Sequence, residues 1–360
     1  MTATTKTLPS GAFAVLTVMS ALAFVGNFLV LLIVIMRSFK KFANSTNALI
    51  GNLAVSDLVY SGISMPLTLA ASTIGQSWTL GNPGCKLVMF LPNFCIAASI
   101  LTMIAIAHDR RVAVINSKPQ FSTSHEIIAA NGAIWILSLI LAAPALYEYS
   151  VYEKEYYASG SGEIKDESGS NEIIDFGSGF NPNDTYLACG SHGIAEDFEK
   201  VYATILFVLA YLLPLLIISG NYLLIWLFIR RKAKEISANL ENGVSGGGGG
   251  AISKGKSKIL KMLLMVVFVF AVAWAPYFAI FVREEVTGAD DTALWGSIQH
   301  VVKLIMAIGS SLLNPIIYAA FNAKYREGFK AILSCRCGDI ASNRVGASTM
   351  TEESRTDANS

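Results

Sequence analysis

The sequence is poor in charged residues, cysteine and histidine. Charged residues make up 15% of the 360 residues and hydrophobic residues 53%, a balance too apolar for an ordinary soluble protein. The four histidines and five cysteines show no metal-ligand spacing, and no His-Glu-x-x-His or Gly-x-Ser-x-Gly motif occurs. We therefore expect neither an enzyme nor a protein that needs a cofactor. With a net charge of +1, we expect no nucleic-acid partner either.

The hydrophobic residues gather in seven stretches of about 20–28 residues, each long enough to cross a hydrocarbon layer of roughly 30 Å. A soluble helical protein would need charged faces on these segments, and they have none. The sequence thus predicts an all-α membrane protein with a seven-helix transmembrane bundle. The predicted spans are Ala12–Met36, Asn47–Ile74, Leu87–Ile115, Ile127–Tyr147, Val201–Ile229, Ile259–Val282 and Leu294–Phe321.

Charge in the connecting segments predicts the orientation. Lysine and arginine follow spans one, five and seven and precede span six, whereas the loops after spans four and six are acidic. By the positive-inside rule, residues 1–11 are extracellular and the C-terminus is cytosolic, as in a multi-pass plasma-membrane protein. No cleavable signal peptide is evident.

Composition also subdivides the rest of the chain around the 12–321 transmembrane domain. The long outer loop, about 148–200, is rich in Gly, Ser and acids, so we expect most of it to be mobile, with a glycosylation sequon at Asn183. The Gly-rich cytosolic loop, about 232–257, predicts a flexible linker. Residues 322–334 suit an amphipathic helix on the membrane surface in contact with lipids, and residues 335–360 a disordered, phosphorylatable tail.

Four of the five cysteines lie in two pairs whose position predicts their chemistry. Cys85 opens the third span on the outer side and Cys189 lies in the long outer loop, so both face an oxidising compartment and favour a disulfide. Cys335 and Cys337 follow the amphipathic segment at the inner face. They are either palmitoylated or free cytosolic thiols.

Five polar residues fall at one depth in the bundle. Counting from the inner end of each span at about 1.5 Å per residue, Asn27, Asp57, Ser99, Ser310 and Asn314 lie roughly 15–20 Å from the cytosolic edge. A carboxylate at this depth must face the interior and be protonated, hydrated or paired with a cation. The layer is either a structural hydrogen-bond network or a site for Na⁺ and water, and depth alone does not separate the two.

The seventh span also contains Pro315 directly after Asn314, which removes a backbone donor in hydrocarbon. Such a defect is tolerated where neighbouring helices repair it. At the inner end of span three, Asp109-Arg110-Arg111 places an acid beside two bases. Such features occur in order along the chain: Gly26-Asn27, Asn52 to Leu58, Trp78 with Cys85, Asp109-Arg110-Arg111, Trp135, Pro214 with Tyr222, Trp274 to Phe278, and finally Asn314 to Tyr318.

In this order the features make the chain resemble a rhodopsin-like (class A) G-protein-coupled receptor over residues 12–335. The resemblance implies that Asp109 holds Arg110 until activation releases it toward a heterotrimeric G protein. It also implies that helix six, kinked at Pro276, swings outward, and that arrestin and receptor kinases are further partners. The other switch residues that it implies are Tyr222, Trp274, Asn314, Pro315 and Tyr318; Asp57, Ser99 and Asn314 match the Na⁺ pocket of the family.

Three residues depart from the family pattern. Arg111 stands where the family usually has Tyr, and Ala273 where many members have Cys. Lys256 replaces an acid that some members use to lock the arginine. We therefore expect that lock to be absent and basal activity to be raised.

The resemblance to the family also excludes two classes of ligand, because residues in the outer half of the bundle differ from those that bind them. Pro92 occupies the position of the amine-binding Asp, and Ile308 that of the retinal-binding Lys. The candidate pocket is aromatic with few charges: Met89, Asn93, Tyr202, Phe207, Tyr211, Trp274, Tyr277, Phe278, His300 and Lys303. The rim is acidic, with Glu148, Glu196, Asp197, Glu284 and Glu285.

An acidic rim attracts a cationic ligand, which favours a peptide. A small apolar or lipid-like ligand is an alternative, because the N-terminus is short. A second alternative is an opsin-related protein that lacks the retinal lysine. A transporter or channel is a more remote alternative, since no paired broken helices are evident.

Overall fold

The computed structural model describes most of the helical bundle. The described residues are 8–38, 45–73, 78–116, 120–121, 123–158, 164–166, 185–191, 196–241 and 293–334, together with single positions between 265 and 283. The tail after residue 334 lies outside them, as do Asn183, Lys256, Cys335 and Cys337.

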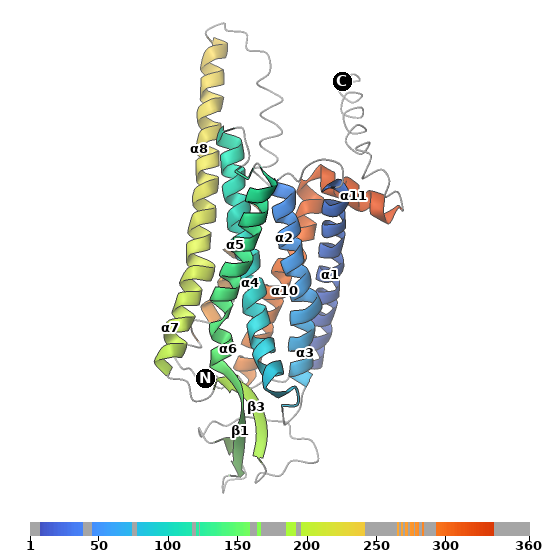
Figure 1. The fold of residues 1–360 in the computed structure, drawn as a ribbon, viewed down its shortest axis with the longest axis vertical. Helices are drawn as coiled ribbons and strands as arrows, with labels where there is room; N and C mark the ends of the chain where they lie inside the picture. The colour runs from blue at the N-terminus through green and yellow to red at the C-terminus, as the bar shows by residue number, and fades with distance from the viewer. Residues whose placement is uncertain are drawn as a thin grey trace.

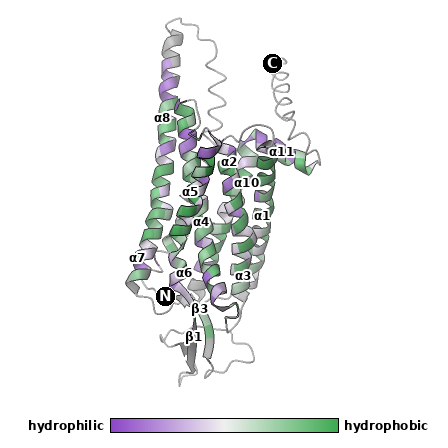
Figure 2. Cartoon of the chain, viewed as in Figure 1, coloured by the Kyte–Doolittle hydropathy of each residue, from purple (hydrophilic) through white to green (hydrophobic). Residues whose placement is uncertain are grey.

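Within the described residues, six helical stretches are long and apolar enough to cross a membrane. They are α1 (Ser10–Ser38), α2 to α3 (Ser45–Thr73), α4 (Gly81–Asn116), α5 with α6 (Ser124–Ala142 and Pro144–Glu148), α7 to α8 (Glu196–Glu241) and α10 (Ala293–Phe321). They run side by side along the long axis (Figure 1), and their hydrophobic residues cover the middle of the bundle (Figure 2). The predicted helical membrane fold is confirmed. Of the sixth predicted span, the structure describes only single helical positions, namely 265, 268, 271–272, 274–276 and 278–280.

Two spans contain a π-helix that ends two positions before a proline. α2 (Ser45–Val59) joins α3 (Met65–Thr73) through η1 (Tyr60–Ser64), and α7 (Glu196–Phe207) joins α8 (Leu213–Glu241) through η2 (Val208–Leu212). The N–H of Met65 donates to Tyr60 O, and that of Leu213 donates to Val208 O. Because each π turn inserts one residue, it rotates the outer part of its helix relative to the inner part.

Several helix ends follow from local sequence. Thr123 caps α5 by accepting from the N–H of Glu126 at 3.2 Å, and the Glu126 carboxylate accepts from the N–H of Thr123 at 3.0 Å. Asn322 caps α11 (Ala323–Leu333) by accepting from Lys324 N at 3.1 Å. α11 leaves the bundle at one end, hereafter the α11 end (Figure 1).

The opposite end carries a three-stranded sheet with the order β2-β1-β3, hereafter the hairpin end (Figure 1). Its strands are β1 (Tyr149–Ala158), β2 (Ile164–Asp166) and β3 (Thr185–Ser191), and β1 pairs antiparallel with both neighbours. The expected disulfide between Cys85 and Cys189 ties β3 to the first turn of α4. Trp78, Val88 and both cysteines form a buried cluster under the sheet.

Two segments differ from the sequence-based expectations. We expected most of residues 148–200 to be mobile, but strands β1 to β3 occupy part of this loop, because backbone pairing and the disulfide fix it to the bundle. We also expected a flexible loop from residue 232, whereas α8 continues to Glu241. The glycines begin after that point, and residues 232–241 include the good helix formers Lys, Ala, Glu and Leu.

Close packing joins α1 to α10 and α11. A Cβ placed on Gly26 would lie 2.9 Å from Pro315 Cγ, and one on Gly328 would lie 2.9 Å from Ile33 Cδ1. Both distances are shorter than a normal carbon contact of about 3.5–4.0 Å. Glycine is therefore needed at both positions for α1 to lie this close to its neighbours.

Candidate functional site

The polar layer at mid-depth converges on the carboxylate of Asp57, which is 2% exposed. Ser99 Oγ and Ser311 Oγ donate to its Oδ1 at 3.2 and 2.9 Å, and Asn314 Nδ2 donates to its Oδ2 at 2.7 Å. Helices α2, α4 and α10 thus meet at one acid. The predicted convergence of Asp57, Ser99 and Asn314 is present in the structure.

Asn27 repairs the backbone defect that Pro315 creates. In an α-helix the carbonyl of Ser311 would accept from the N–H of residue 315, which proline lacks. Asn27 Nδ2 donates to Ser311 O at 3.0 Å, and to Ala23 O on its own helix at 2.9 Å. Its Oδ1 is buried and has no hydrogen-bond partner among the described residues. Asn27 therefore joins the layer through the backbone of α10.

The neighbouring serine is the one that reaches Asp57. We predicted Ser310 in the layer, but its hydroxyl donates to Ala307 O at 2.8 Å within α10. Ser311 makes the contact with Asp57 instead. One residue changes depth by only about 1.5 Å but turns the side chain by about 100° around the helix, so counting depth did not distinguish the two serines.

A second defect lies beside the layer and was not foreseen from the sequence. The α-helical donor to Ser61 O would be Met65 N, which pairs with Tyr60 O instead; the π-helical donor would come from Pro66, which has no N–H. Ser20 Oγ on α1 donates to Ser61 O at 2.6 Å. Ser61 Oγ in turn donates to Asp57 O at 2.6 Å. The chain Ser20–Ser61–Asp57 links α1 to the acid through η1.

Asn52 connects three helices closer to the α11 end. Its Nδ2 donates to Thr102 Oγ1 at 2.7 Å, and its Oδ1 accepts from Trp135 Nε1 at 2.8 Å. Through these bonds α2 holds both α4 and α5. Asn52 and Trp135 belong to the ordered motifs of the sequence, and their partner Thr102 is 0% exposed.

At the α11 end, Asp109 holds Arg110. The ion pair measures 2.5 Å from Arg110 Nη2 to Asp109 Oδ2. Asp109 is 0% exposed and also accepts from Ser45 Oγ at 2.9 Å and from Gln120 N at 3.1 Å. Arg110 also contacts the hydroxyl of Thr46. The fully buried carboxylate of Asp109, which accepts from Arg110, Ser45 and Gln120, thus holds the guanidinium against its own helix.

Arg111 takes no part in that ion pair. Its Nη2 lies 3.3 Å from His108 Nδ1 on the same helix. The second positive charge of the Asp109-Arg110-Arg111 run is therefore directed to a different neighbour from the first.

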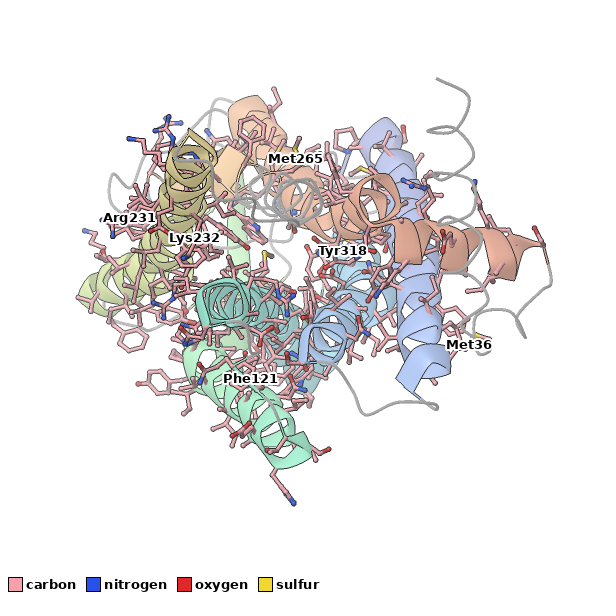
Figure 3. All side chains as sticks on the ribbon, turned by 90° about the horizontal axis from the view of Figure 1, so that it is seen from above. Met36, Phe121, Arg231, Lys232, Met265 and Tyr318 are labelled. Carbon is pink, nitrogen blue, oxygen red and sulfur yellow. A yellow bond between two sulfur atoms is a disulfide. The ribbon has the colours of Figure 1, made fainter. Side chains whose placement is uncertain are left out.

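The two predicted switch tyrosines are buried and lie on different helices. Tyr222 on α8 is 3% exposed and belongs to the main hydrophobic core with Trp274. Tyr318 on α10 is 5% exposed, and its ring centroid lies 5.4 Å from that of Tyr325 on α11. Figure 3 shows Tyr318 toward the middle of the bundle when it is viewed from the α11 end.

A cavity between α4, α5, α7 and η2 matches part of the predicted pocket. Two predicted residues, Asn93 and Phe278, line it directly, together with Ile96, Ala97, Leu141, Leu206 and Ala210. The sequence analysis did not predict the last five, because an aliphatic residue in a pocket wall cannot be told from one in the ordinary core by sequence. The wall is apolar with one amide.

Aromatic rings surround Phe278. Its centroid lies 6.1 Å from Phe207, 5.1 Å from Tyr211 and 6.1 Å from Trp274. The Tyr202 hydroxyl donates to Leu141 O at 3.2 Å, next to the cavity. Four predicted aromatic residues thus lie around the cavity as an outer layer.

The remaining predicted pocket residues have other surroundings. Met89 packs on the disulfide cluster and accepts from Asn93 Nδ2 at 3.1 Å. His300 and Lys303 are partly buried on α10, and the cavity wall does not include them. The side chain of Tyr277 lies outside the described residues.

The acidic rim is only partly described. Glu148 was predicted on the acidic rim, and it is only 5% exposed because α6 packs against α4 and β1. The side chains of Glu196, Asp197, Glu284 and Glu285 lie outside the described residues.

Comparison with known proteins identifies relatives over the whole bundle. The family model "7 transmembrane receptor (rhodopsin family)" matches residues 26–318. The chain is 27% identical to a QRFP-like peptide receptor of Branchiostoma floridae, covering 91% of this chain and 78% of the relative. It is 26% identical to galanin receptor type 1 of Rattus norvegicus, covering 88% and 80%, and 31% identical to neuropeptide Y receptor type 2 of Sus scrofa, covering 87% and 73%.

These relatives are receptors, which confirms that the chain is not an enzyme. Amine receptors and opsins were excluded from Pro92 and Ile308, in agreement with the relatives found. The bundle, the disulfide and the matched family model together establish that the chain belongs to the rhodopsin family of seven-transmembrane receptors.

Proposed function

We propose that this receptor binds an extracellular peptide at its hairpin end and activates heterotrimeric G proteins at its α11 end. The observation that carries the proposal is the buried ion pair between Asp109 and Arg110. Activation requires two states with different contacts at the coupling surface. Releasing Arg110 requires breaking its ion pair with Asp109 on the same helix and one hydrogen bond to Thr46 on α2.

The peptide ligand is supported by the names of the relatives, which are receptors for QRFP-like peptide, galanin and neuropeptide Y. The hairpin end offers a sheet and a cavity lined by Asn93 and Phe278, into which the end of a peptide could insert. A small apolar ligand is the second candidate, because the rest of the cavity wall is apolar.

In this proposal the hairpin end is extracellular and the α11 end is cytosolic. The disulfide between Cys85 and Cys189 supports this orientation, because disulfides persist in oxidising compartments. Helix six moves outward on activation, and Trp274 and Pro276 lie in the described part of that helix. Arrestin and receptor kinases then act at the α11 end, and Asn183 is glycosylated on the other side.

A sodium ion at Asp57 is part of the same proposal. The residues present fit such an ion, because the Asp57 carboxylate and the hydroxyls of Ser99 and Ser311 are oxygen ligands. Asn27 Oδ1 is a buried acceptor with no partner in the described part of the chain, and it suits a bridging water. A bound cation would neutralise the buried acid and hold α2, α4 and α10 together.

The experiment is a screen of peptides, including C-terminally amidated ones, and of small apolar ligands in cells that express the full chain, with readouts for several G-protein subtypes. Arg110→Gln should abolish the ligand-dependent signal and retain ligand binding. Arg111→Gln is the matched control, since Arg111 contacts His108 and not Asp109; it should keep the signal.

Asp109→Asn weakens the hold on Arg110 and should raise ligand-independent signalling, because the ion pair is replaced by a weaker hydrogen bond to a neutral amide. Full signalling by Arg110→Gln would contradict the proposed coupling role. A response to apolar ligands with none to peptides would favour the second candidate.

A further inference from the structure

The side of α8 that faces away from the bundle ends in basic residues. Along the transmembrane part of α8, Tyr222 and Ile225 are buried at 3% and 1%, whereas Leu223 and Leu227 are 55% and 38% exposed. In a membrane receptor, the exposed leucines mark the face of the helix that contacts lipid tails.

Three cations continue this face beyond Ile229, where the uninterrupted apolar run of α8 ends. In a helix, residues four or seven positions apart lie on one side. Arg230 follows Leu223 by seven positions, and Arg231 and Lys234 follow Leu227 by four and seven. All three side chains are exposed. They lie within one turn, about 6 Å along the axis, directly beyond the lipid-facing leucines.

The other cation of this turn is already paired. Lys232 Nζ lies 3.0 Å from Glu235 Oε2, and by helical phase Lys232 points to the bundle side, below Ile225. Among the described residues, Arg230, Arg231 and Lys234 have no ion pair. Figure 3 shows Arg231 and Lys232 at the rim of the bundle, viewed from the α11 end.

A tryptophan fixes one member of the cluster. The guanidinium carbon of Arg230 lies 4.2 Å from the ring centroid of Trp226, which is itself 39% exposed. The cation over the indole face is an attractive contact, and exposed tryptophans favour the boundary between lipid tails and headgroups. The contact therefore places Arg230 at the level of the headgroups and limits its motion.

We propose that Arg230, Arg231 and Lys234 form a binding site for the headgroup of a lipid that carries several phosphates, a phosphoinositide of the cytosolic leaflet. The inference rests on the proposed function for the orientation of the α11 end. Clustered cations next to a transmembrane helix attract such headgroups. A G protein that enters the bundle near Tyr222 meets the opposite side of α8, so the charge of this cluster complements the leaflet.

The test uses the full chain purified in detergent, where no charged bilayer surface is present. Native mass spectrometry measures the fraction of receptor that carries phosphatidylinositol 4,5-bisphosphate as this lipid is titrated, with phosphatidylserine as the comparison. Lys234→Gln should weaken phosphoinositide binding about fivefold, and the triple change Arg230→Gln, Arg231→Gln and Lys234→Gln should abolish the preference over phosphatidylserine.

Lys232→Gln is the matched control, because it removes the same charge from the same turn on the other side of the helix. It should weaken binding less than about twofold, as expected for an exposed, already paired lysine. All substitutions lie at exposed positions, and thermal unfolding of each variant verifies that the fold is retained.

Equal weakening by Lys232→Gln and Lys234→Gln would overturn the site, since diffuse charge would explain it. Equal binding of phosphatidylserine would overturn it as well, as would loss of binding to purified G protein by Lys234→Gln in the absence of lipid.

Peptide-stimulated nucleotide exchange in neutral phosphatidylcholine nanodiscs tests the proposed function separately. A receptor that signals there but binds no phosphoinositide refutes this inference alone, and one that binds the lipid but never signals refutes the proposed function alone.

Discussion

Replacing Ser20 by alanine tests whether α1 repairs the backbone of the second span. Ser20 Oγ donates to Ser61 O at 2.6 Å, and both residues are buried, at 5% and 2% exposure. Without this hydroxyl, the carbonyl of Ser61 has no helical donor, because Met65 N pairs with Tyr60 O and Pro66 has no N–H. An unsatisfied buried carbonyl costs about 1–3 kcal/mol, which is the expected loss of stability for Ser20→Ala.

Ser138→Ala is the matched control. Ser138 is 0% exposed and its hydroxyl donates to Ile134 O at 2.7 Å within α5. That carbonyl keeps its backbone partner when the hydroxyl is removed, so the control should be nearly neutral. Thermal unfolding of the purified receptor in detergent measures both variants. Equal effects of Ser20→Ala and Ser138→Ala would refute the repair.

A double-mutant cycle with Pro66 isolates the mechanism. Alanine at position 66 restores an N–H that can donate to Ser61 O in the π-helical register. Ser20→Ala should therefore cost less in the Pro66→Ala background, with an interaction energy of about 1 kcal/mol. Additive effects of the two substitutions would show that the carbonyl of Ser61 is not their shared partner.

Three further predictions concern packing, the disulfide and the mid-depth acid. Gly26→Ala should be less stable than Gly220→Ala by about 1–3 kcal/mol in thermal unfolding, because a Cβ at Gly26 meets Pro315 Cγ at 2.9 Å and one at Gly220 meets no described residue within 4 Å. Cys85→Ala opens a link across a sequence separation of 104; it should cost about 2–5 kcal/mol and reduce agonist binding to the surface-expressed receptor. Asp57→Asn should make agonist affinity equal in sodium chloride and in choline chloride of the same ionic strength, and a persistent sodium effect would contradict the proposed site.

Sequence alone predicted the depth of the polar layer but not its angular arrangement. Depth follows from counting residues along a helix, which brought Asp57, Ser99 and Asn314 to one level. The direction of a side chain depends on the rotation of the whole helix. Ser310 and Ser311 differ little in depth, and only the packing of α10 decides that Ser311 faces Asp57.

The π-helices and the hairpin carry weaker signals. A proline after an apolar run predicts a defect, as at Pro66 and Pro214, but whether the turn before it adopts the π form depends on partners in other helices, such as Ser20. Strands β1 and β3 pair across a long intervening segment, so no two-residue turn marks the hairpin in the sequence. A glycine- and serine-rich loop therefore suggested mobility where the paired strands lie.

Among the described residues, the helices of the bundle are joined by two kinds of contact. Hydrogen bonds from Asp57, Asn27 and Asn52 join α1, α2, α4, α5 and α10. The described part of the sixth span meets α7 and η2 through the ring of Phe278, which contacts Phe207 and Tyr211, and through a long bond of 3.4 Å from the Tyr211 hydroxyl to Ala271 O. Ring contacts depend less on direction than hydrogen bonds do, so rings can slide where buried polar pairs would have to break. The ring contacts of the described sixth-span residues thus support the outward movement that we propose for helix six, relative to the helices that hydrogen bonds join through Asp57, Asn27 and Asn52.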